Sequence, residues 1–173
     1  MIKNALSQPG PGFDDPLAML YACHDRVRHY ARLVPRLAAH LAIRGCDAEA
    51  QQAASGILRY FNVAAPLHHQ DEEDDLFPAL QCCADARLAA SMSRLQAEHD
   101  GLALLWSRLR VQLEDIQQGE AGLDAELAQA FARRYCEHAA AEEQEIYERA
   151  RGLLNQEQLS AMGERMAQRR KTS

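Results

Sequence analysis

Four histidines and two glutamates in this chain are spaced as metal ligands on helices would be. Two of the histidines are followed four residues later by a glutamate, and residues four apart on a helix share a face. Each such pair can offer an imidazole nitrogen and a carboxylate oxygen in one direction. Four helices that aim these groups at a shared core would form a dinuclear metal site. The six candidate metal ligands are His24, His68, Glu72, His99, His138 and Glu142.

The donor types in this set favour iron, manganese or zinc, because imidazole and carboxylate come without a thiolate. Four imidazoles supply four donor atoms and two carboxylates supply four more, so two ions would receive four each. An octahedral ion would keep about two further positions, for a bridging oxo or hydroxo group and a small exogenous ligand. We expect two iron ions (Fe2+ or Fe3+), since an open di-iron pocket can bind O2, NO or peroxide. Zinc and manganese remain alternatives.

The placement of these six residues on apolar stripes is better evidence for a metal site when they are taken together than when each is taken alone. One histidine on an apolar stripe is more often a core residue with one hydrogen bond than a ligand. Here each of the four long helical stretches carries one stripe histidine, while His29, His40 and His69 fall off the stripes. Glu72 and Glu142 also lie on stripes, where an unpaired carboxylate is costly to bury. The two glutamates therefore need a cation or a hydrogen-bonded network.

Several neighbours of the ligands are better interpreted as supporting groups. His69 and Glu73 are also four apart, but their stripe would pass through Asn62, so His68 with Glu72 fits better. Glu98, next to His99, is expected on the surface. Tyrosines near such a site are more often packing residues than redox groups. The candidates for positions behind the ligands, or on a solvated face, are His69, Glu73, Glu143, Tyr21 and Tyr135.

The helices that would hold these residues are predicted by apolar positions that alternate three and four residues apart. Alanine, leucine, glutamine, glutamate and arginine dominate, which favours helix over strand. We therefore predict an all-α, up-down-up-down four-helix bundle with a short C-terminal helix. The helices are expected over about 16–44, 47–78, 85–118 and 127–153, and the short fifth segment over 155–168.

Prolines mark where these helices begin and bend. An aspartate at position 14 or 15 can cap the first helix ahead of Pro16. Pro35 should kink this helix, and Pro66 should interrupt the second helix two residues before His68. This second kink either is merely tolerated or helps to aim His68. In an antiparallel bundle the four histidines lie about 12 to 22 Å from the same end, at about 1.5 Å per residue, so the six side chains can converge.

The same pattern divides the chain into three parts. Residues 1–13, which include Pro9-Gly10-Pro11-Gly12, predict a flexible N-terminal arm. Residues 14–168 are expected to form the bundle with its C-terminal extension. Residues 169–173 carry Arg169, Arg170 and Lys171 and predict a basic, solvated tail.

The overall composition argues against several other classes of protein. The 173 residues carry a formal net charge of −6 and no basic patch beside aromatic residues, so nucleic acid is not an expected partner. No apolar run reaches about 18 residues, so no membrane span is expected. The N-terminus lacks an apolar signal segment, and five cysteines without Cys-x-x-Cys spacing favour free thiols in a reducing cytoplasm. The oligomeric state stays open.

The chain resembles the hemerythrin-like, or HHE cation-binding, family in four segments: CHDRV at 23–27, HHQDEEDDLFPAL at 68–80, AEHDGL at 97–102 and EHAAAEEQEIY at 137–147. The resemblance covers residues 17 to about 153. It implies a four-helix up-down bundle with a non-haem di-iron centre. It would assign metal binding to the same six histidines and glutamates.

Two departures from the O2-carrying hemerythrins bear on function. Those proteins have a second histidine on the third helix, four residues before the other, where this chain has Leu95. Their last helix offers an aspartate after a longer gap, whereas this chain has Glu142 four residues after His138. Losing a histidine opens a coordination position and argues against reversible O2 carriage.

The resemblance makes a protein that binds, senses or reacts with O2, NO or peroxide the leading hypothesis. A peroxide- or NO-reducing enzyme would differ by consuming its substrate catalytically. An iron donor for iron homeostasis or iron–sulfur repair would hold its iron loosely. A metal-free interaction module would show no effect of metal on stability. Whether the protein is an enzyme is not decided by the sequence.

Overall fold

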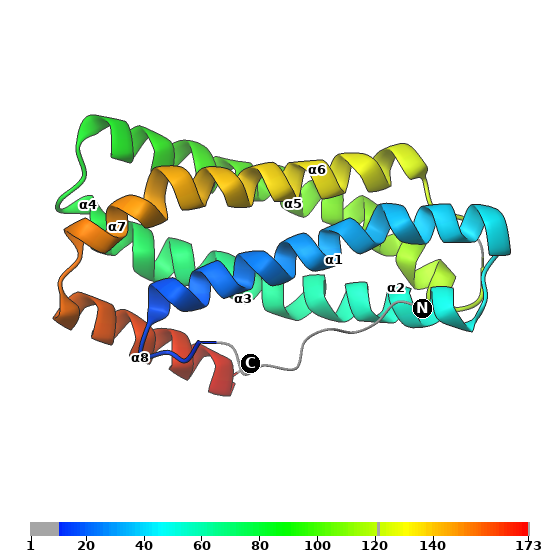
Figure 1. Cartoon of the computed structure of the whole chain (residues 1–173), viewed down its shortest axis with the longest axis horizontal. Helices are drawn as coiled ribbons and strands as arrows, with labels where there is room; N and C mark the ends of the chain where they lie inside the picture. Colours follow the sequence, from blue (N-terminus) through cyan, green and yellow to red (C-terminus); the bar gives the residue numbers. More distant parts are fainter. Residues whose placement is uncertain (1–10, 121, 173) are drawn as a thin grey trace.

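The computed structural model describes residues 11–120 and 122–172, and these form helices joined by short loops, without a strand. The chain is an all-α four-helix bundle, as the sequence predicts, with a further helix on its outside (Figure 1). Two bundle helices are unbroken α-helices, while the other two contain π-helical turns, labelled η. The elements are α1 (Pro16–Arg44), α2 (Ala48–Arg59), η1 (Tyr60–Ala64), α3 (Ala65–Gln70), η2 (Asp71–Leu76), α4 (Phe77–Gln81), α5 (Ala86–Gln117), α6 (Ala125–Glu142), η3 (Glu143–Tyr147), α7 (Glu148–Leu153) and α8 (Gln156–Thr172).

Aspartate side chains begin the bundle helices. Asp15 accepts a hydrogen bond from the backbone N–H of Ala18, which fixes the start of α1 at Pro16 as expected. Asp47, Asp85 and Asp124 cap α2, α5 and α6 in the same way, and each such cap contributes about 1 kcal/mol. α1 is one continuous helix through Pro35, so the predicted kink does not interrupt it.

Two of the π turns lie immediately ahead of prolines in the second bundle helix. The N–H of Ala65 bonds to the carbonyl of Tyr60, just before Pro66, and the N–H of Phe77 bonds to the carbonyl of Glu72, just before Pro78. A proline ring clashes with the carbonyl four residues back in a regular α-helix. The wider π turn accommodates this ring. The interruption predicted at Pro66 is therefore a π turn, η1, and the chain stays helical through it.

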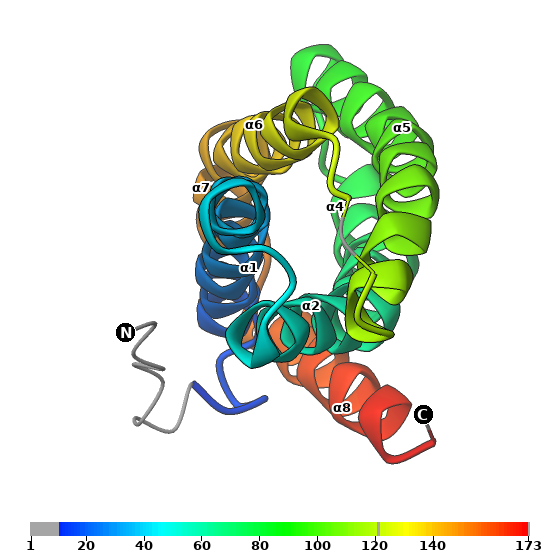
Figure 2. The same ribbon diagram turned by 90° about the vertical axis from the view of Figure 1, so that its right-hand side faces the viewer.

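The polar candidate ligands form a layer between two apolar cores. Seen end-on, the four bundle helices surround a common axis, with α1 beside α2 and α6, and α5 closing the ring (Figure 2). Along α1, for example, Leu20 and Val27 belong to different cores and His24 lies between them. The core near the α1–α2 loop includes Val34, Ile57, Leu113 and Phe131, and the core near α8 includes Leu17, Leu80, Leu95 and Ile146.

The C-terminal helix is fastened to the bundle by arginines that pair with buried aspartates. Asp71 and Asp75 on η2 are 0% and 1% exposed. Arg169 donates to Asp71 at 2.5 Å and to Asp75 at 2.9 Å, and Arg170 donates to Asp71 at 2.6 Å. Arg165 also donates to Asp75. The prediction of a solvated tail at 169–173 is therefore wrong for Arg169 and Arg170. The sequence did not reveal these ion pairs because the aspartates are distant along the chain.

The predicted N-terminal arm is only partly described. Residues 1–10 lie outside the described part of the chain. Phe13, placed in the arm by the sequence, packs instead against the core near α8, and the Arg170 guanidinium lies 5.3 Å from its ring centroid.

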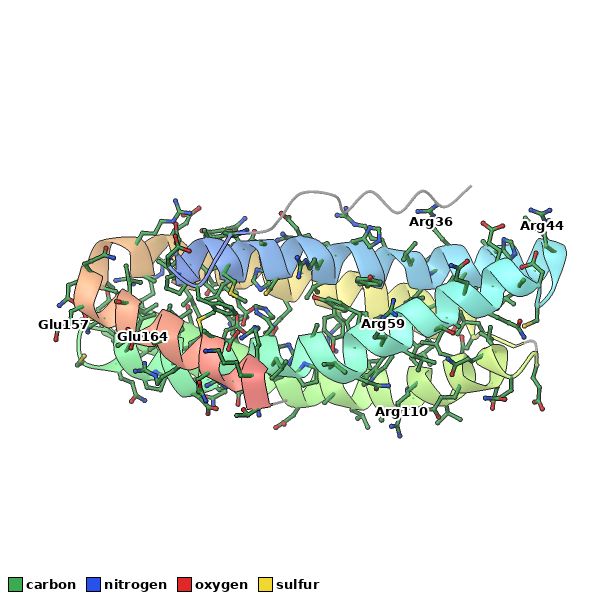
Figure 3. The ribbon with its side chains drawn as sticks, turned by 90° about the horizontal axis from the view of Figure 1, so that it is seen from below. Arg36, Arg44, Arg59, Arg110, Glu157 and Glu164 are labelled. Carbon is green, nitrogen blue, oxygen red and sulfur yellow. The ribbon has the colours of Figure 1, made fainter. Side chains whose placement is uncertain are left out.

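Charged side chains cover the outer faces of the molecule. Figure 3 shows Arg36 and Arg110 on the bundle and Glu157 and Glu164 on α8. Among the described residues, no helix is long and apolar enough to cross a membrane.

The paired substitution Arg169→Ala and Arg170→Ala should destabilise the fold. It leaves Asp71 buried without its cations, and breaking a buried ion pair from one side costs about 3 kcal/mol. Urea unfolding followed by circular dichroism measures the change. The matched control replaces Arg108 and Arg133, which are exposed and make no ion pair within the described residues. Equal unfolding free energies for the two double variants would contradict the role given to α8.

Candidate metal centre

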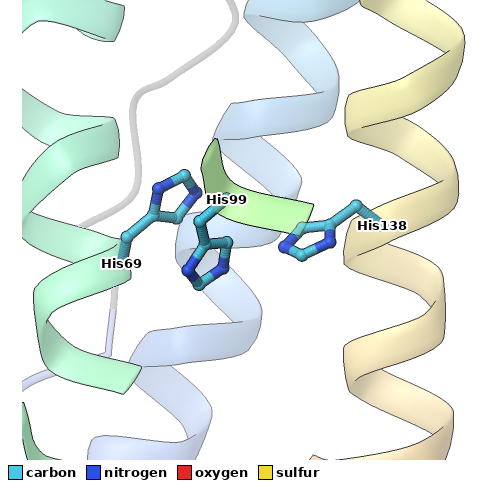
Figure 4. Close-up of side chains that lie close together, drawn as sticks. All are labelled: His69, His99 and His138. Carbon is cyan, nitrogen blue, oxygen red and sulfur yellow. The ribbon is translucent and has the colours of Figure 1, made fainter. Parts of the chain in front are cut away.

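Seven side chains in the polar layer form two groups that could each hold a metal ion. In each group one ligand atom per residue lies within 4.8 Å of all the others. The first group consists of His24, His68, Glu72 and Glu142. The second group consists of His69, His99 and His138, which approach one another from three helices (Figure 4). The structure thus brings all six predicted ligands into one layer and adds His69.

Both glutamates face the two groups at once. Glu142 places Oε2 3.1 Å from Nε2 of His24, and its Oε1 lies 3.2 Å from Nε2 of His138. Glu72 places Oε1 3.7 Å from Nε2 of His68, and its Oε2 lies 3.6 Å from Nε2 of His99. Each carboxylate therefore presents one oxygen to each group, which is the geometry of a carboxylate that bridges two ions through both oxygens.

Buried polar atoms in this layer lack partners, which tests whether metal ions fit. In the described part of the chain, five fully buried side-chain atoms make no hydrogen bond, and all five belong to this site. An unsatisfied buried polar group costs about 1–3 kcal/mol. All five are nitrogen or carboxylate oxygen atoms that can donate a lone pair to a cation, so the residues present fit a metal centre. These atoms are His68 Nδ1, Glu72 Oε2, His99 Nε2, His138 Nε2 and Glu142 Oε1.

Carboxylates on the outer side orient three of the histidines. The Nδ1 atoms of His24 and His99 lie 3.0 Å from Glu143 and 2.5 Å from Glu73. Nδ1 of His138 lies 3.1 Å from Glu98 in the same arrangement. An Nδ1–H that donates to a carboxylate leaves Nε2 as the metal-binding atom and makes it more basic.

Two of these outer glutamates are themselves held by arginines. Arg28 donates to Glu143 at 2.7 Å, and Arg94 donates to Glu98 at 2.7 Å. Hydrogen bonding to His24 and Arg28 outweighs the effect of burial and lowers the pKa of Glu143 to about 2. Glu98 is partly exposed, in agreement with its predicted surface position. Its contact with Nδ1 of His138 also orients that imidazole, which the sequence did not suggest.

Burial and mutual contact control the charge of the layer. Burial raises the pKa of Glu72 well above its ordinary value, and the neighbouring Glu142 raises it further. Burial also opposes ionisation of Glu142, but the imidazoles of His138, His24 and His99 that face its carboxylate hold its pKa well below the ordinary value. Burial lowers the pKa of His68 strongly and that of His69 to about 3. Both are therefore neutral imidazoles at physiological pH, the form that binds metal.

His69 is placed among the possible ligands rather than behind them. Its ring stacks on that of His99, with centroids 4.0 Å apart, and it completes a three-histidine group. The sequence placed it behind the ligands because the stripe it shares with Glu73 passes through Asn62. Consecutive residues on a helix differ by about 100°, so His68 and His69 can point to either side of the bundle axis.

Tyr147 is the residue that sequence reasoning missed. It is fully buried, and its hydroxyl donates to Oε1 of Glu72 and lies 3.1 Å from Nε2 of His24. The candidate Tyr21 instead packs edge-on against Tyr147, at 5.2 Å between ring centroids. Tyr135 belongs to an aromatic cluster with Phe61 and Phe131 beside the three-histidine group.

A buried layer of histidines and two glutamates across a four-helix bundle defines a metal-binding bundle protein. The family model for the hemerythrin HHE cation-binding domain matches residues 15–150, and the chain belongs to this family. A relative from Haemophilus influenzae, described only as an uncharacterized protein, is 37% identical over 159 residues, which cover 91% of each chain. α8, with its arginines, lies beyond the matched domain.

The substitution Glu72→Ala should lower the amount of bound metal, because it removes an oxygen from each of the two groups. Metal content per chain, measured by elemental analysis after loading and desalting, tests this. The loaded variant should also unfold at a lower temperature than the loaded wild type, since a bound ion stabilises the fold that binds it. Glu137→Ala is the matched control, because Glu137 is exposed on α6. Unchanged stoichiometry in Glu72→Ala would contradict the ligand assignment.

The substitution His69→Ala should weaken metal binding at the three-histidine group and leave the other group loaded. We expect metal content to fall toward one ion per chain in competition with a chelator. Gln70→Ala, an exposed change on the same helix, should retain the wild-type content. Full retention of metal by His69→Ala would return this residue to a supporting position.

Proposed function

We propose that the protein holds two iron ions in this layer and binds, senses or reacts with a small ligand such as O2, NO or peroxide. One observation carries the proposal: two separate groups of nitrogen donors share two buried carboxylates whose oxygens point in opposite directions. A single ion could not bind both groups of donors at once. Two-metal sites hold their ions about 3.5–4 Å apart with bridging ligands of this kind.

The donor count supports iron over zinc. Three histidines and one oxygen from each bridging glutamate would give the ion at the second group five donors. Protein-bound zinc is almost always four-coordinate in structural sites and keeps three protein ligands in catalytic ones. Iron and manganese accept five or six ligands of these types. Within the described residues, no cysteine belongs to either group, as this hard donor set requires.

The two positions would differ in how open they are. His24 and His68 with the other two glutamate oxygens make four donors, one fewer than at the three-histidine position. An octahedral ion there would keep about two positions for other ligands. Bound iron would supply an open coordination position and a reversible change of charge to a small ligand. The His24–His68 side is therefore the place for such a ligand.

The protein itself contributes orientation and exclusion of water. The outer glutamates Glu143, Glu73 and Glu98 hold three imidazoles in fixed orientations. The apolar cores on either side of the layer leave its ligands at most 6% exposed, apart from His69. Such burial admits a diatomic molecule or peroxide more readily than a large substrate. It also opposes ready release of iron, which a donor protein would need.

Anaerobic loading with ferrous iron, followed by exposure to air, tests this function. We expect about two irons per chain and near-ultraviolet absorption from a bridged ferric pair on oxidation. NO added to the ferrous protein should give a spectrum that saturates at a fixed ratio to protein. The Glu72→Ala variant is the negative control. Zinc in the purified protein, with no response to iron, would contradict the proposal, and catalytic loss of peroxide or NO would identify an enzyme.

A further inference from the structure

Tyr147 lies among the metal-binding atoms of the His24–His68 side. Its side chain is 0% exposed, and its hydroxyl contacts Oε1 of Glu72 and lies 3.1 Å from Nε2 of His24. Its ring is stacked on the imidazole of His24, with centroids 5.0 Å apart and an interplanar angle of 12°. Both neighbouring atoms are proposed donors to the same ion.

We propose that Tyr147 is itself a ligand of that ion, through its phenolate oxygen. The inference rests on the proposed di-iron function. Two donors at about 2.1 Å from one ion, in adjacent octahedral positions, lie about 3.0 Å apart. The separation of the Tyr147 hydroxyl and Nε2 of His24 matches this spacing. On binding, the phenol O–H bond is broken, an iron–oxygen bond forms and the proton leaves to solvent, without change of oxidation state.

The π turn η3 is what brings Tyr147 to this position. In a regular α-helix a residue five positions after Glu142 lies about 140° away around the axis. In η3 the N–H of Glu148 bonds to the carbonyl five residues back, at Glu143. The wider turn rotates Tyr147 toward the face that carries Glu142. No proline follows this turn, unlike η1 and η2, so accommodation of a proline ring does not explain it.

The charge of the layer favours a third anionic ligand. Counted over the ligands alone, two ferrous ions with two glutamates and neutral histidines leave two positive charges, and oxidation adds more. Uncompensated charge is costly to bury. A phenolate removes one of these charges, and iron accepts tyrosinate as a ligand in other proteins. Of the outer carboxylates that contact the histidines, Glu143 and Glu98 are already paired with Arg28 and Arg94.

This ligand would control access to the open side. With Tyr147 bound, the His24–His68 position has five donors, like its partner, and only one place for another ligand. An incoming small molecule therefore competes with the tyrosine or with whatever bridges the ions. In the resting protein, Tyr147 would therefore occupy one of the two coordination positions that are otherwise open on this side.

The test is the visible spectrum of the iron-loaded, oxidised protein. Phenolate bound to ferric iron gives a charge-transfer band in the visible region, and resonance Raman excitation in that band enhances phenolate ring vibrations. Wild type should show both, and the vibrations should shift when tyrosine is ring-deuterated. Tyr147→Phe should lose the band, keep two irons and bind azide more tightly. Tyr135→Phe is the matched control, because Tyr135 is also a buried tyrosine but lies in the aromatic cluster, and it should keep the band.

The outcomes separate this inference from the proposed function. Two irons per chain without phenolate vibrations in wild type, or with them in Tyr147→Phe, would overturn the inference and leave the di-iron centre in place. Failure of wild type to bind iron would overturn both. If Tyr147→Phe does not fold, phenolate vibrations that persist in Tyr21→Phe and Tyr135→Phe support the inference, and their loss in either variant overturns it.

Discussion

Two carboxylates buried in the middle of an apolar bundle are the constraint on which the rest of this structure depends. Glu72 and Glu142 are 0% exposed and lie between two hydrophobic cores. Isolated carboxylates in such surroundings would be strongly unfavourable. The surrounding imidazoles satisfy them only in part, since Glu72 Oε2 and Glu142 Oε1 stay without hydrogen bonds. Metal ions in this layer would complete these bonds and tie the bundle helices together, so function and stability share one cause.

Outward from this layer, carboxylates and cationic or imidazole groups alternate. The histidines face the glutamates on the inside and carboxylates such as Glu143 and Glu98 on the outside. Arginines then neutralise these carboxylates near the surface. On the opposite side of η2, Asp71 and Asp75 are neutralised by arginines of α8. The helix beyond the family domain thereby fastens the segment that carries Glu72 from behind.

Local widening of the helices adapts a regular bundle to this polar layer. η2 contains Glu72, and η3 begins directly after Glu142 and ends with Tyr147. π turns often occur at functional sites, because the extra residue in the turn changes which side chains face inward. Here they let His68, Glu72, Glu142 and Tyr147 meet although simple 3.6-residue periodicity would not align all of them.

Much of this molecule was determined by its sequence alone. Alternating spacing of apolar residues predicted the four helices, aspartates marked the starts of the first three, and the His-x-x-x-Glu pairs identified the layer, because these signals are local. The tertiary structure decided the rest. His68 and His69, consecutive on α3, belong to different ligand groups, and this became visible only when the helices were packed. Tyr147 reaches the layer through the π turn η3, which apolar periodicity does not reveal. Arg169 and Arg170 found Asp71 and Asp75 only through the packing of α8 on η2. Such contacts join residues distant in the sequence, so no pattern within one helix could have predicted them.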